Sequence, residues 1–383
     1  MQHNPKIHVS VYGSGLGHAA RTSKLLAYLK ERCIIYSTSW GEGRAYLNRL
    51  GYDCREIPQL DVGWGDQDRM SFKKTVRGLP TFYGTFGLQI YREIEIMKQE
   101  SPQLVISDSR LSSIIAASYL GIPSVLLTNQ LRINLPVLTG KMMRFLERVN
   151  GESLAAFWIS ADAIIVPDLP PPYTISQYSL SPLRLTQNRL TYVGLFAGAK
   201  NYIESNPKRD RPKVFFSLTG PLVSRRWIKP LMLKAARMLA DTGRVDVVFS
   251  SGNPEGSQLP EKIGKLLYYE WCPDTDAQIQ DSDLVVTRSG HSTISKLVVS
   301  GKPSVLIPIP MHGEQWGNAK KCQELGIARA FDQLSTSSSK LFEGIVDAIN
   351  DPSLKKSAER VREIAVKHDG VRNAVGLLQK MLQ

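Results

Sequence analysis

The sequence Leu284-Val-Val-Thr-Arg-Ser-Gly-His-Ser-Thr293 decides the fold class of this chain. Its first four residues form an apolar, β-branched run, which is typical of a buried strand, and the Gly/Ser-rich segment after it opens a helix. A second unit follows, with the apolar run at residues 304–310 and a polar turn from Met311 into another helix. Strands that alternate with helices in this way predict an α/β domain with a parallel sheet, whose ligand-binding loops lie at one edge.

The loop Ser289-Gly-His-Ser-Thr293 has the composition of an anion-binding turn. Its small side chains, two hydroxyls and free backbone N–H groups lie at a helix start, where the helix dipole favours a diphosphate. The alternative is that Ser292 or Thr293 only caps the helix. Glu314-Gln315-x-x-Asn318, at the head of the next helix, favours a ligand, because paired polar groups suit the hydroxyls of a sugar or ribose.

These motifs resemble the donor-binding signature of the GT-B glycosyltransferases, most of all that of the MurG-like branch, glycosyltransferase family 28. The resemblance continues through Gly301-Lys-Pro303 and Pro308-Ile-Pro310. It implies a GT-B fold, with two Rossmann-like domains facing across a cleft, and a UDP-sugar donor. In the family the Gly-x-Ser-Thr loop holds the diphosphate and the Glu-Gln pair reads the sugar. The donor-side residues that it implies are Gly15, Gly17, Thr219, Gly220, Trp271, Cys272, Arg288, Ser289, Gly290, His291, Ser292, Thr293, Lys296, Glu314, Gln315 and Asn318.

One position departs from the family pattern. MurG-like proteins usually carry a glutamate on the helix after Ser-Thr, where it binds the ribose hydroxyls, and this chain has Lys296. An ammonium group offers no acceptor for hydroxyl protons. The departure leaves open an altered nucleotide or a protein that no longer uses a donor.

His18 is the first catalytic candidate. It lies in Gly13-Ser-Gly-Leu-Gly17-His18, between a strand at residues 7–12 and a helix. Dinucleotide binding is the competing interpretation of such a loop, but no acidic residue ends the second strand at residues 33–38. The loop instead resembles the first loop of MurG-like proteins and of related nucleotide-sugar hydrolases. An imidazole, with a pKa of about 6.5, suits a general base, although His18 can also cap the helix or contact phosphate.

Asp108 is the second catalytic candidate, at the end of the apolar strand 104–108. It can orient the acceptor hydroxyl or take its proton, or it can cap the next helix. Asn129 and Gln130 end the following strand and are candidates on the acceptor side.

The sequence predicts neither a metal nor another cofactor. Asp66-x-Asp68 and Asp274-x-Asp276 imitate the metal-binding motif of the other glycosyltransferase superfamily. Asp274, however, lies at a predicted helix start, where aspartate is a common cap.

The 383 residues are enough for two domains with separate cores. We predict an acceptor-side domain at residues 1–197, a linker at 198–212 and a donor domain at 213–369. The last helix, at about residues 370–383, is expected to pack back on the first domain, as the resemblance implies.

The net charge of +13, from 48 Lys and Arg against 35 Asp and Glu, predicts an acidic partner such as nucleotide phosphates or anionic lipid. No motif of a nucleic-acid-binding protein is present, so nucleic acid is not expected. The four cysteines have no C-x-x-C spacing, and no signal peptide precedes the first strand, which predicts a cytoplasmic protein.

Two segments combine basic and apolar residues, at 69–89 and 141–148. They predict peripheral contact with an anionic membrane on its inner face, or helices that pack inward with solvated charges outside. The resemblance adds a lipid-linked acceptor, because MurG-like proteins carry such a patch on the first domain.

The predicted activity is inverting, metal-independent transfer of a hexose or N-acetylhexosamine from UDP to an acceptor hydroxyl. The alternatives are a nucleotide-sugar hydrolase, which uses water as acceptor, and a non-catalytic nucleotide-sugar-binding protein. A UDP-sugar 2-epimerase would need acidic residues flanking the sugar, and the sequence shows no such pair.

Overall fold

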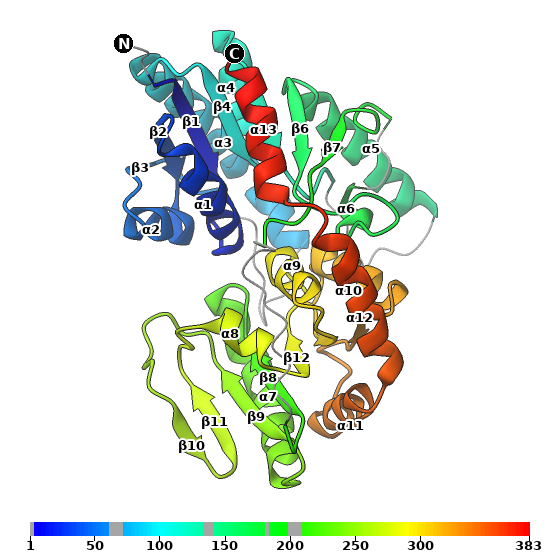
Figure 1. Ribbon diagram of the computed structural model, residues 1–383. Helices are drawn as coiled ribbons and strands as arrows, with labels where there is room; N and C mark the ends of the chain where they lie inside the picture. Colours follow the sequence, from blue (N-terminus) through cyan, green and yellow to red (C-terminus); the bar gives the residue numbers. More distant parts are fainter. Residues whose placement is uncertain (1–3, 61–71, 133–140, 181–183, 198–208) are drawn as a thin grey trace.

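The computed structural model describes residues 4–60, 72–132, 141–180, 184–197 and 209–383 (Figure 1). In this described part, the chain forms two seven-stranded sheets with helices packed around each. All strand pairs are parallel except β10 with β11. The predicted α/β class is confirmed.

The first sheet has the order β3-β2-β1-β4-β5-β6-β7. Its connections cross between parallel strands through helices, so the carboxyl ends of the strands share one edge. The elements are β1 (Lys6–Val11), α1 (Gly17–Leu29), β2 (Ile34–Ser39), α2 (Gly41–Arg49), β3 (Cys54–Glu56), α3 (Phe72–Glu100), β4 (Leu104–Asp108), α4 (Leu111–Leu120), β5 (Ser124–Leu127), α5 (Lys141–Trp158), β6 (Ala163–Val166), α6 (Gln177–Leu180) and β7 (Leu190–Tyr192).

The second sheet has the order β10-β11-β9-β8-β12-β13-β14. Its elements are β8 (Lys213–Ser217), α7 (Leu222–Asp241), β9 (Asp246–Ser250), β10 (Glu261–Ile263), β11 (Leu266–Tyr269), α8 (Thr275–Gln280), β12 (Leu284–Thr287), α9 (His291–Val299), β13 (Ser304–Leu306), α10 (Gly313–Glu324), β14 (Ala328–Ala330), α11 (Ser338–Ile349), α12 (Pro352–Ala365) and α13 (Gly370–Met381).

Each sheet has its own apolar core, because the strands are buried on both faces. Val9 and Leu104 belong to the first core, and Phe216 and Val286 to the second, all without exposed surface. Burying side chains of this size contributes about 1.5–3 kcal/mol each. The cores hold the loops at the strand ends in place, and these loops carry the candidate site.

Helix α13 returns to the first sheet after α11 and α12 have packed with the second (Figure 1). Its residues Val371, Ala374 and Leu378 join the core around β1 and α1. The chain passes closely there, because a Cβ on Gly370 would lie 2.3 Å from the carbonyl oxygen of Gly194. The final helix therefore fastens the two halves of the chain to each other.

The basic, apolar segments are described only in part. Residues 69–71 lie outside the described residues, as do the side chains of 72–79 and most side chains of 141–150. The described end of α3 exposes Phe82, Tyr83, Leu88 and Tyr91. Among the helices of the described ranges, none has the length and apolarity that a membrane crossing requires.

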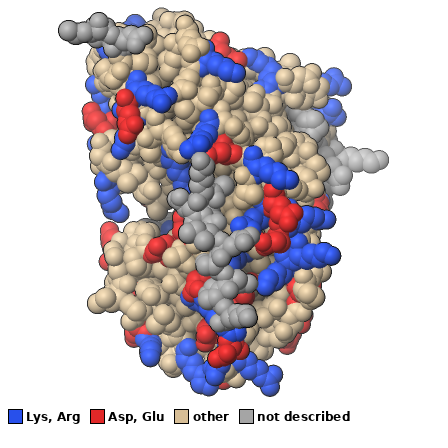
Figure 2. Space-filling model, in the orientation of Figure 1, with Lys and Arg blue, Asp and Glu red and all other residues tan. Residues whose placement is uncertain are grey.

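Charge on the surface is mixed. On the face in Figure 2, basic side chains are spread over both halves, with acidic side chains among them. On this face the described basic side chains therefore do not gather into one stripe.

A buried polar network anchors α3 to the first sheet. His8, on β1, contacts Glu93 through Nε2 (2.8 Å) and Glu100 through Nδ1 (2.7 Å), and the Arg110 guanidinium lies 2.7 Å from Glu93. Burial acts to lower the pKa of His8, but Glu93 and Glu100 outweigh it and raise the pKa to about 9. His8 is therefore an imidazolium ion that pairs with two buried carboxylates.

The stability of the protein should fall as His8 loses its proton. In the unfolded chain histidine titrates near pH 6.5, so this contribution is complete below about pH 6.5 and is lost as the pH rises through about 9. Urea unfolding across this range should show the fall in wild type, and His8→Gln should lack it. Parallel curves for the two proteins would contradict the assignment.

Candidate active site

The candidate site lies where the starts of α1 and α9 meet, one from each sheet (Figure 1). The Ser292 hydroxyl donates to the carbonyl oxygen of Gly17 at 3.2 Å, so the two predicted loops are in contact. Helix α1 begins after Leu16 and helix α9 begins after Gly290. Among the described residues, no side chain caps either helix start. Two helix N-termini therefore offer backbone N–H groups and positive dipole ends at one place, as an anion requires.

His18 lies on the first turn of α1 and is held by Asp108, at the end of β4. Its Nδ1 lies 2.8 Å from the carboxylate, and the His18 side chain is 26% exposed whereas Asp108 is fully buried. If Nδ1–H donates to Asp108, the neutral ring presents an unprotonated Nε2. This arrangement can remove a proton from a hydroxyl group that approaches His18.

Arg21 fixes Asp108 in turn. Its Nε donates to the carboxylate at 2.8 Å, its Nη2 contacts the same group, and the Thr22 hydroxyl donates to it at 2.5 Å. Burial acts to raise the pKa of Asp108, but Arg21 and His18 outweigh it and hold the pKa well below its usual range. Asp108 is thus a charged group that positions His18.

A chain of polar contacts continues from Arg21 to the second sheet. Arg21 Nη1 donates to Asn129 Oδ1 at 2.6 Å, and Asn129 Nδ2 donates to Glu314 Oε1 at 3.1 Å. Burial acts to raise the pKa of the Glu314 carboxyl, but the imidazoles of His312 and His18 lower it below its usual value. Glu314 is therefore a carboxylate at the meeting point of the two sheets, and it can accept hydrogen bonds from sugar hydroxyls.

The His291 side chain faces the first sheet. It is buried, and its Nε2 lies 3.1 Å from Asp168 Oδ2. Asp168 also accepts from the backbone N–H groups of Leu169, Ile175 and Ser176. Asp168 belongs to none of the motifs quoted above, and its one signal in the sequence is an acidic residue shortly after the apolar run at residues 163–166.

Four other predicted donor residues have side chains that hold the loops in shape. Arg288 donates to the Ile307 carbonyl at 3.0 Å and to Gln333 at 2.7 Å. The Ser289 hydroxyl donates to the Gln315 carbonyl at 2.8 Å, and Asn318 donates to the Ser289 carbonyl at 3.1 Å. Gln315 accepts from the backbone N–H of Ile309 at 3.0 Å. These contacts couple the α9 loop to the start of α10.

Four more predicted donor residues follow the carboxyl ends of β8 and β11 in the second sheet: Thr219, Gly220, Trp271 and Cys272. The hydroxyls of Thr219 and Thr287 lie 3.3 Å apart. Gly220 has a φ of 100°, a conformation that glycine adopts without strain. Trp271 is half-buried and Cys272 is buried, which raises the pKa of its thiol. The loop at residues 15–17 belongs to the first half of the chain. The hydrogen bond from the Ser292 hydroxyl to the Gly17 carbonyl joins this loop to the start of α9.

Lys296 has an acidic neighbour. Its ammonium group donates to Asp276 Oδ1 on α8 at 2.5 Å. Asp274 accepts from the N–H of Ala277, which confirms the predicted helix cap. The other acidic pair, Asp66 and Asp68, lies outside the described residues. Within the described ranges no three His, Cys, Asp or Glu side chains come together as a metal site would need.

Comparison with known proteins gives the class. Residues 225–371 match the glycosyltransferase family 28 C-terminal domain. An uncharacterized glycosyltransferase of Methanosarcina acetivorans is 29% identical over 98% of both chains. A UDP-N-acetylglucosamine–N-acetylmuramyl-(pentapeptide) pyrophosphoryl-undecaprenol N-acetylglucosamine transferase of Zymomonas mobilis is 36% identical over 29% of each chain.

Solved structures give the fold. The glycosyltransferase of kitacinnamycin superposes with a TM-score of 0.72 at 17% identity, over the full length of both chains. The spinosyn rhamnosyltransferase SpnG, in complex with thymidine diphosphate, gives a TM-score of 0.69 at 13% identity, over 98% of this chain and all of the other. Together with the sequence relatives, these structures establish a glycosyltransferase with the GT-B fold. The match of residues 225–371 to the family 28 domain, together with the sequence relatives, supports the family 28-like branch of that class.

Replacing Asp108 by Asn should destabilise the protein. The substitution leaves Arg21 buried beside a neutral group, and removing one partner of a buried ion pair typically costs about 3–5 kcal/mol. Urea unfolding measures the loss, and Asp53→Asn is the control, since Asp53 is an exposed carboxylate before β3 of the same sheet. Equal stability of the two variants would show that the Arg21–Asp108 pair contributes little.

Proposed function

We propose that the protein transfers a hexose or N-acetylhexosamine from a UDP-sugar to an acceptor hydroxyl, with inversion and without a metal ion. The observation that carries the proposal is the meeting of the uncapped α9 N-terminus with His18 and Glu314. The bacterial relative named for a UDP-N-acetylglucosamine substrate, and the thymidine diphosphate complex of SpnG, support a nucleotide-sugar donor. In this proposal the first sheet binds the acceptor and the second sheet binds the donor.

The donor diphosphate would lie at the first turn of α9. Backbone N–H groups at His291 and Ser292, together with the Ser292 and Thr293 hydroxyls, supply hydrogen bonds to its oxygens. The helix dipole adds favourable charge, and both effects strengthen as the phosphate becomes a leaving group. Thr219 and Gly220 line the adjacent loop. Glu314 would hold a hydroxyl of the sugar.

His18 would act as the general base. The acceptor oxygen attacks the anomeric carbon from the side opposite the diphosphate, and the acceptor proton passes to His18 Nε2. The new carbon–oxygen bond forms as the bond to the phosphate oxygen breaks, so a single displacement inverts the anomeric centre. The charged Asp108 stabilises the imidazolium that results, and Arg21 keeps Asp108 in place.

The Lys296–Asp276 pair allows a ribose to be bound despite the missing glutamate. The Lys296 ammonium group donates to Asp276 Oδ1, and the other lone pairs of this carboxylate can still accept hydrogen bonds from ribose hydroxyls. Its side chain is 45% exposed, so a ribose hydroxyl can reach it. We therefore retain UDP as the proposed nucleotide.

The proposal extends to a lipid-linked acceptor and to peripheral contact with an anionic membrane. The exposed Phe82, Tyr83, Leu88 and Tyr91 on α3 support it, because aromatic side chains favour the membrane interface. Co-sedimentation with anionic vesicles measures this contact, and absence of binding would remove it.

Replacing His18 by Asn should slow transfer strongly and leave donor binding unchanged. A general base contributes about 10²- to 10⁴-fold to the rate, so kcat should fall by this factor while the Kd for UDP stays the same. Sugar transfer and calorimetric titration give the two quantities. Retained turnover would remove His18 from the reaction, and turnover without any acceptor would identify a hydrolase.

Adding a negative charge to the first turn of α9 should weaken nucleotide binding. Ser292→Glu places a carboxylate where the diphosphate is expected, and the Kd for UDP should rise at least about tenfold through like-charge repulsion. Ser339→Glu is the matched control, because it adds the same charge to the first turn of α11. Equal Kd values in titrations of the two variants would place the nucleotide elsewhere.

A further inference from the structure

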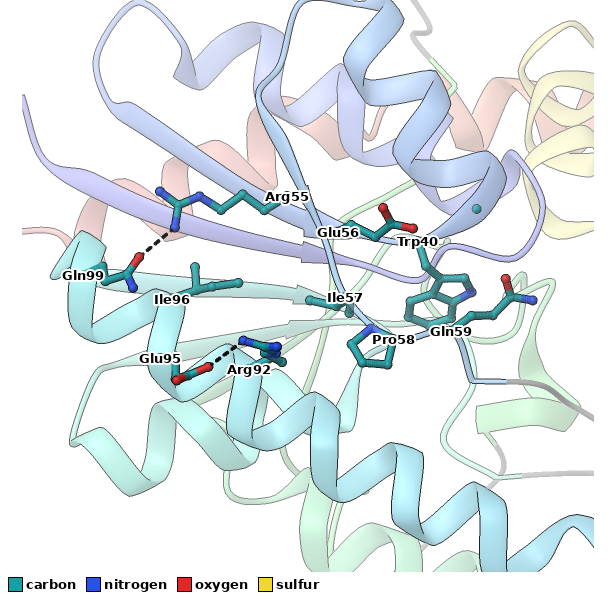
Figure 3. Close-up of a pocket in the computed structure, with 11 residues that line it drawn as sticks. Trp40, Arg55, Glu56, Ile57, Pro58, Gln59, Arg92, Glu95, Ile96 and Gln99 are labelled. Carbon is teal, nitrogen blue, oxygen red and sulfur yellow. Dashed lines mark hydrogen bonds and ion pairs between the residues drawn. The ribbon is translucent and has the colours of Figure 1, made fainter.

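A second recess opens on the first sheet, away from the meeting of α1 and α9. A pocket of about 670 Å³ lies between the edge strand β3 and the C-terminal half of α3 (Figure 3). This volume is in the range of small-molecule sites. Its lining residues are Trp40, Gly41, Arg55, Glu56, Ile57, Pro58, Gln59, Arg92, Glu95, Ile96 and Gln99.

The walls of the pocket are tied together at two points. Arg55 on β3 donates to Gln99 on α3 at 3.2 Å, as Figure 3 shows. Near the other end, the buried Gln89 of α3 donates to the Pro58 carbonyl at 2.5 Å. The pocket is therefore formed before any ligand enters, which reduces the entropy lost on binding.

The charged residues of the lining all have counter-ions. Arg92 pairs with Glu95 at 3.0 Å and Glu56 with Arg44 at 3.1 Å. The Arg55 guanidinium lies 3.7 Å from Glu100 Oε1. The described lining carries two cations, Arg55 and Arg92, and two carboxylates, Glu56 and Glu95, so it has no net charge and suits a neutral molecule, in contrast to the net charge of +13.

The lining combines hydrogen-bonding groups with an apolar strip. Two glutamine amides and two guanidinium groups provide donors, and two carboxylates provide acceptors. Pro58 and Ile96, both partly exposed, provide the apolar surface, whereas Trp40 and Ile57 are each only 2% exposed. Behind Arg55, the buried Glu100 Oε1 has no hydrogen-bond partner among the described residues. A pyranose ring has this dual character, with hydroxyls at its edge and C–H groups on its faces.

Trp40 connects the pocket to the candidate active site. Its Nε1 donates to the Ser14 hydroxyl at 3.3 Å, in the loop that leads to His18. The Tyr12 ring lies 4.9 Å from the Trp40 ring and 5.2 Å from the His18 ring, measured between centroids. The Trp40 and Tyr12 rings thus lie between the pocket and His18.

We propose that this pocket binds a neutral saccharide, the part of a glycan acceptor that lies beyond the reacting hydroxyl. The inference rests on the proposed transferase function, and it narrows the acceptor to a molecule that carries an uncharged sugar. The pocket selects the acceptor, and the groups around His18 perform the reaction.

Saturation-transfer NMR and calorimetry with cellobiose, chitobiose, mannobiose and lactose test the pocket in the full chain without nucleotide. At least one disaccharide should bind to wild type, and the double variant Arg92→Ala/Gln99→Ala should weaken this binding at least about tenfold, since it removes two lining groups. Lys98→Ala, an exposed cation of α3 outside the lining, should bind as wild type does. Failure of all four sugars to bind, or equal affinity in the double variant, would overturn the site.

Transfer assays test the acceptor role. The double variant should raise KM for a glycan acceptor and leave both kcat and the Kd for UDP unchanged. An unchanged KM would overturn the acceptor role even if a saccharide binds. UDP binding to wild type is measured in a separate titration. If wild type binds UDP but no disaccharide, the saccharide pocket is wrong and the proposed transferase function still stands. If wild type does not bind UDP, the proposed function itself fails.

Discussion

The buried ion pair of Arg21 with Asp108 is the interaction on which the candidate site depends. It joins α1 to the end of β4, keeps the carboxylate charged in the core, and through that carboxylate sets the position of His18. Arg21 also reaches Asn129, which contacts Glu314 of the second sheet. One guanidinium group therefore positions His18, the proposed general base, and contributes to the contact between the two sheets.

Among the described contacts that cross between the two halves, two involve α9. Ser292 donates to the Gly17 carbonyl, and the His291 imidazole lies against Asp168. The same turn that would bind the diphosphate thus also holds the two halves together. The nucleotide and the first sheet would both contact this turn. We therefore expect donor binding to be coupled to the approach of the two halves, as is common in enzymes whose active site is completed by domain closure.

The fold could be predicted, and so could the edge of each sheet at which the candidate loops lie, because both follow from local patterns. Buried runs that end in Gly/Ser-rich turns, at residues 7–18 and 284–293, place their loops at the carboxyl edge of each parallel sheet. Arg21 could not be assigned, since its partner Asp108 lies 87 residues away. Sequence also does not give the direction of a side chain. The resemblance assigns Gln315 to the sugar, but no motif indicates that its Oε1 accepts from the backbone N–H of Ile309. The pocket beside β3 depends on the packing of α3 and has no sequence motif.

We propose that the diphosphate of a sugar nucleotide binds at the start of α9, beside His18. A crystal structure of the protein with UDP would locate the nucleotide. We expect phosphate oxygens within hydrogen-bond distance of the backbone N–H groups of His291 and Ser292, with Glu314 and His18 on the side where the sugar would continue. A diphosphate bound away from α9, or crystals grown with UDP in which no nucleotide is bound, would show that α9 is not the donor site.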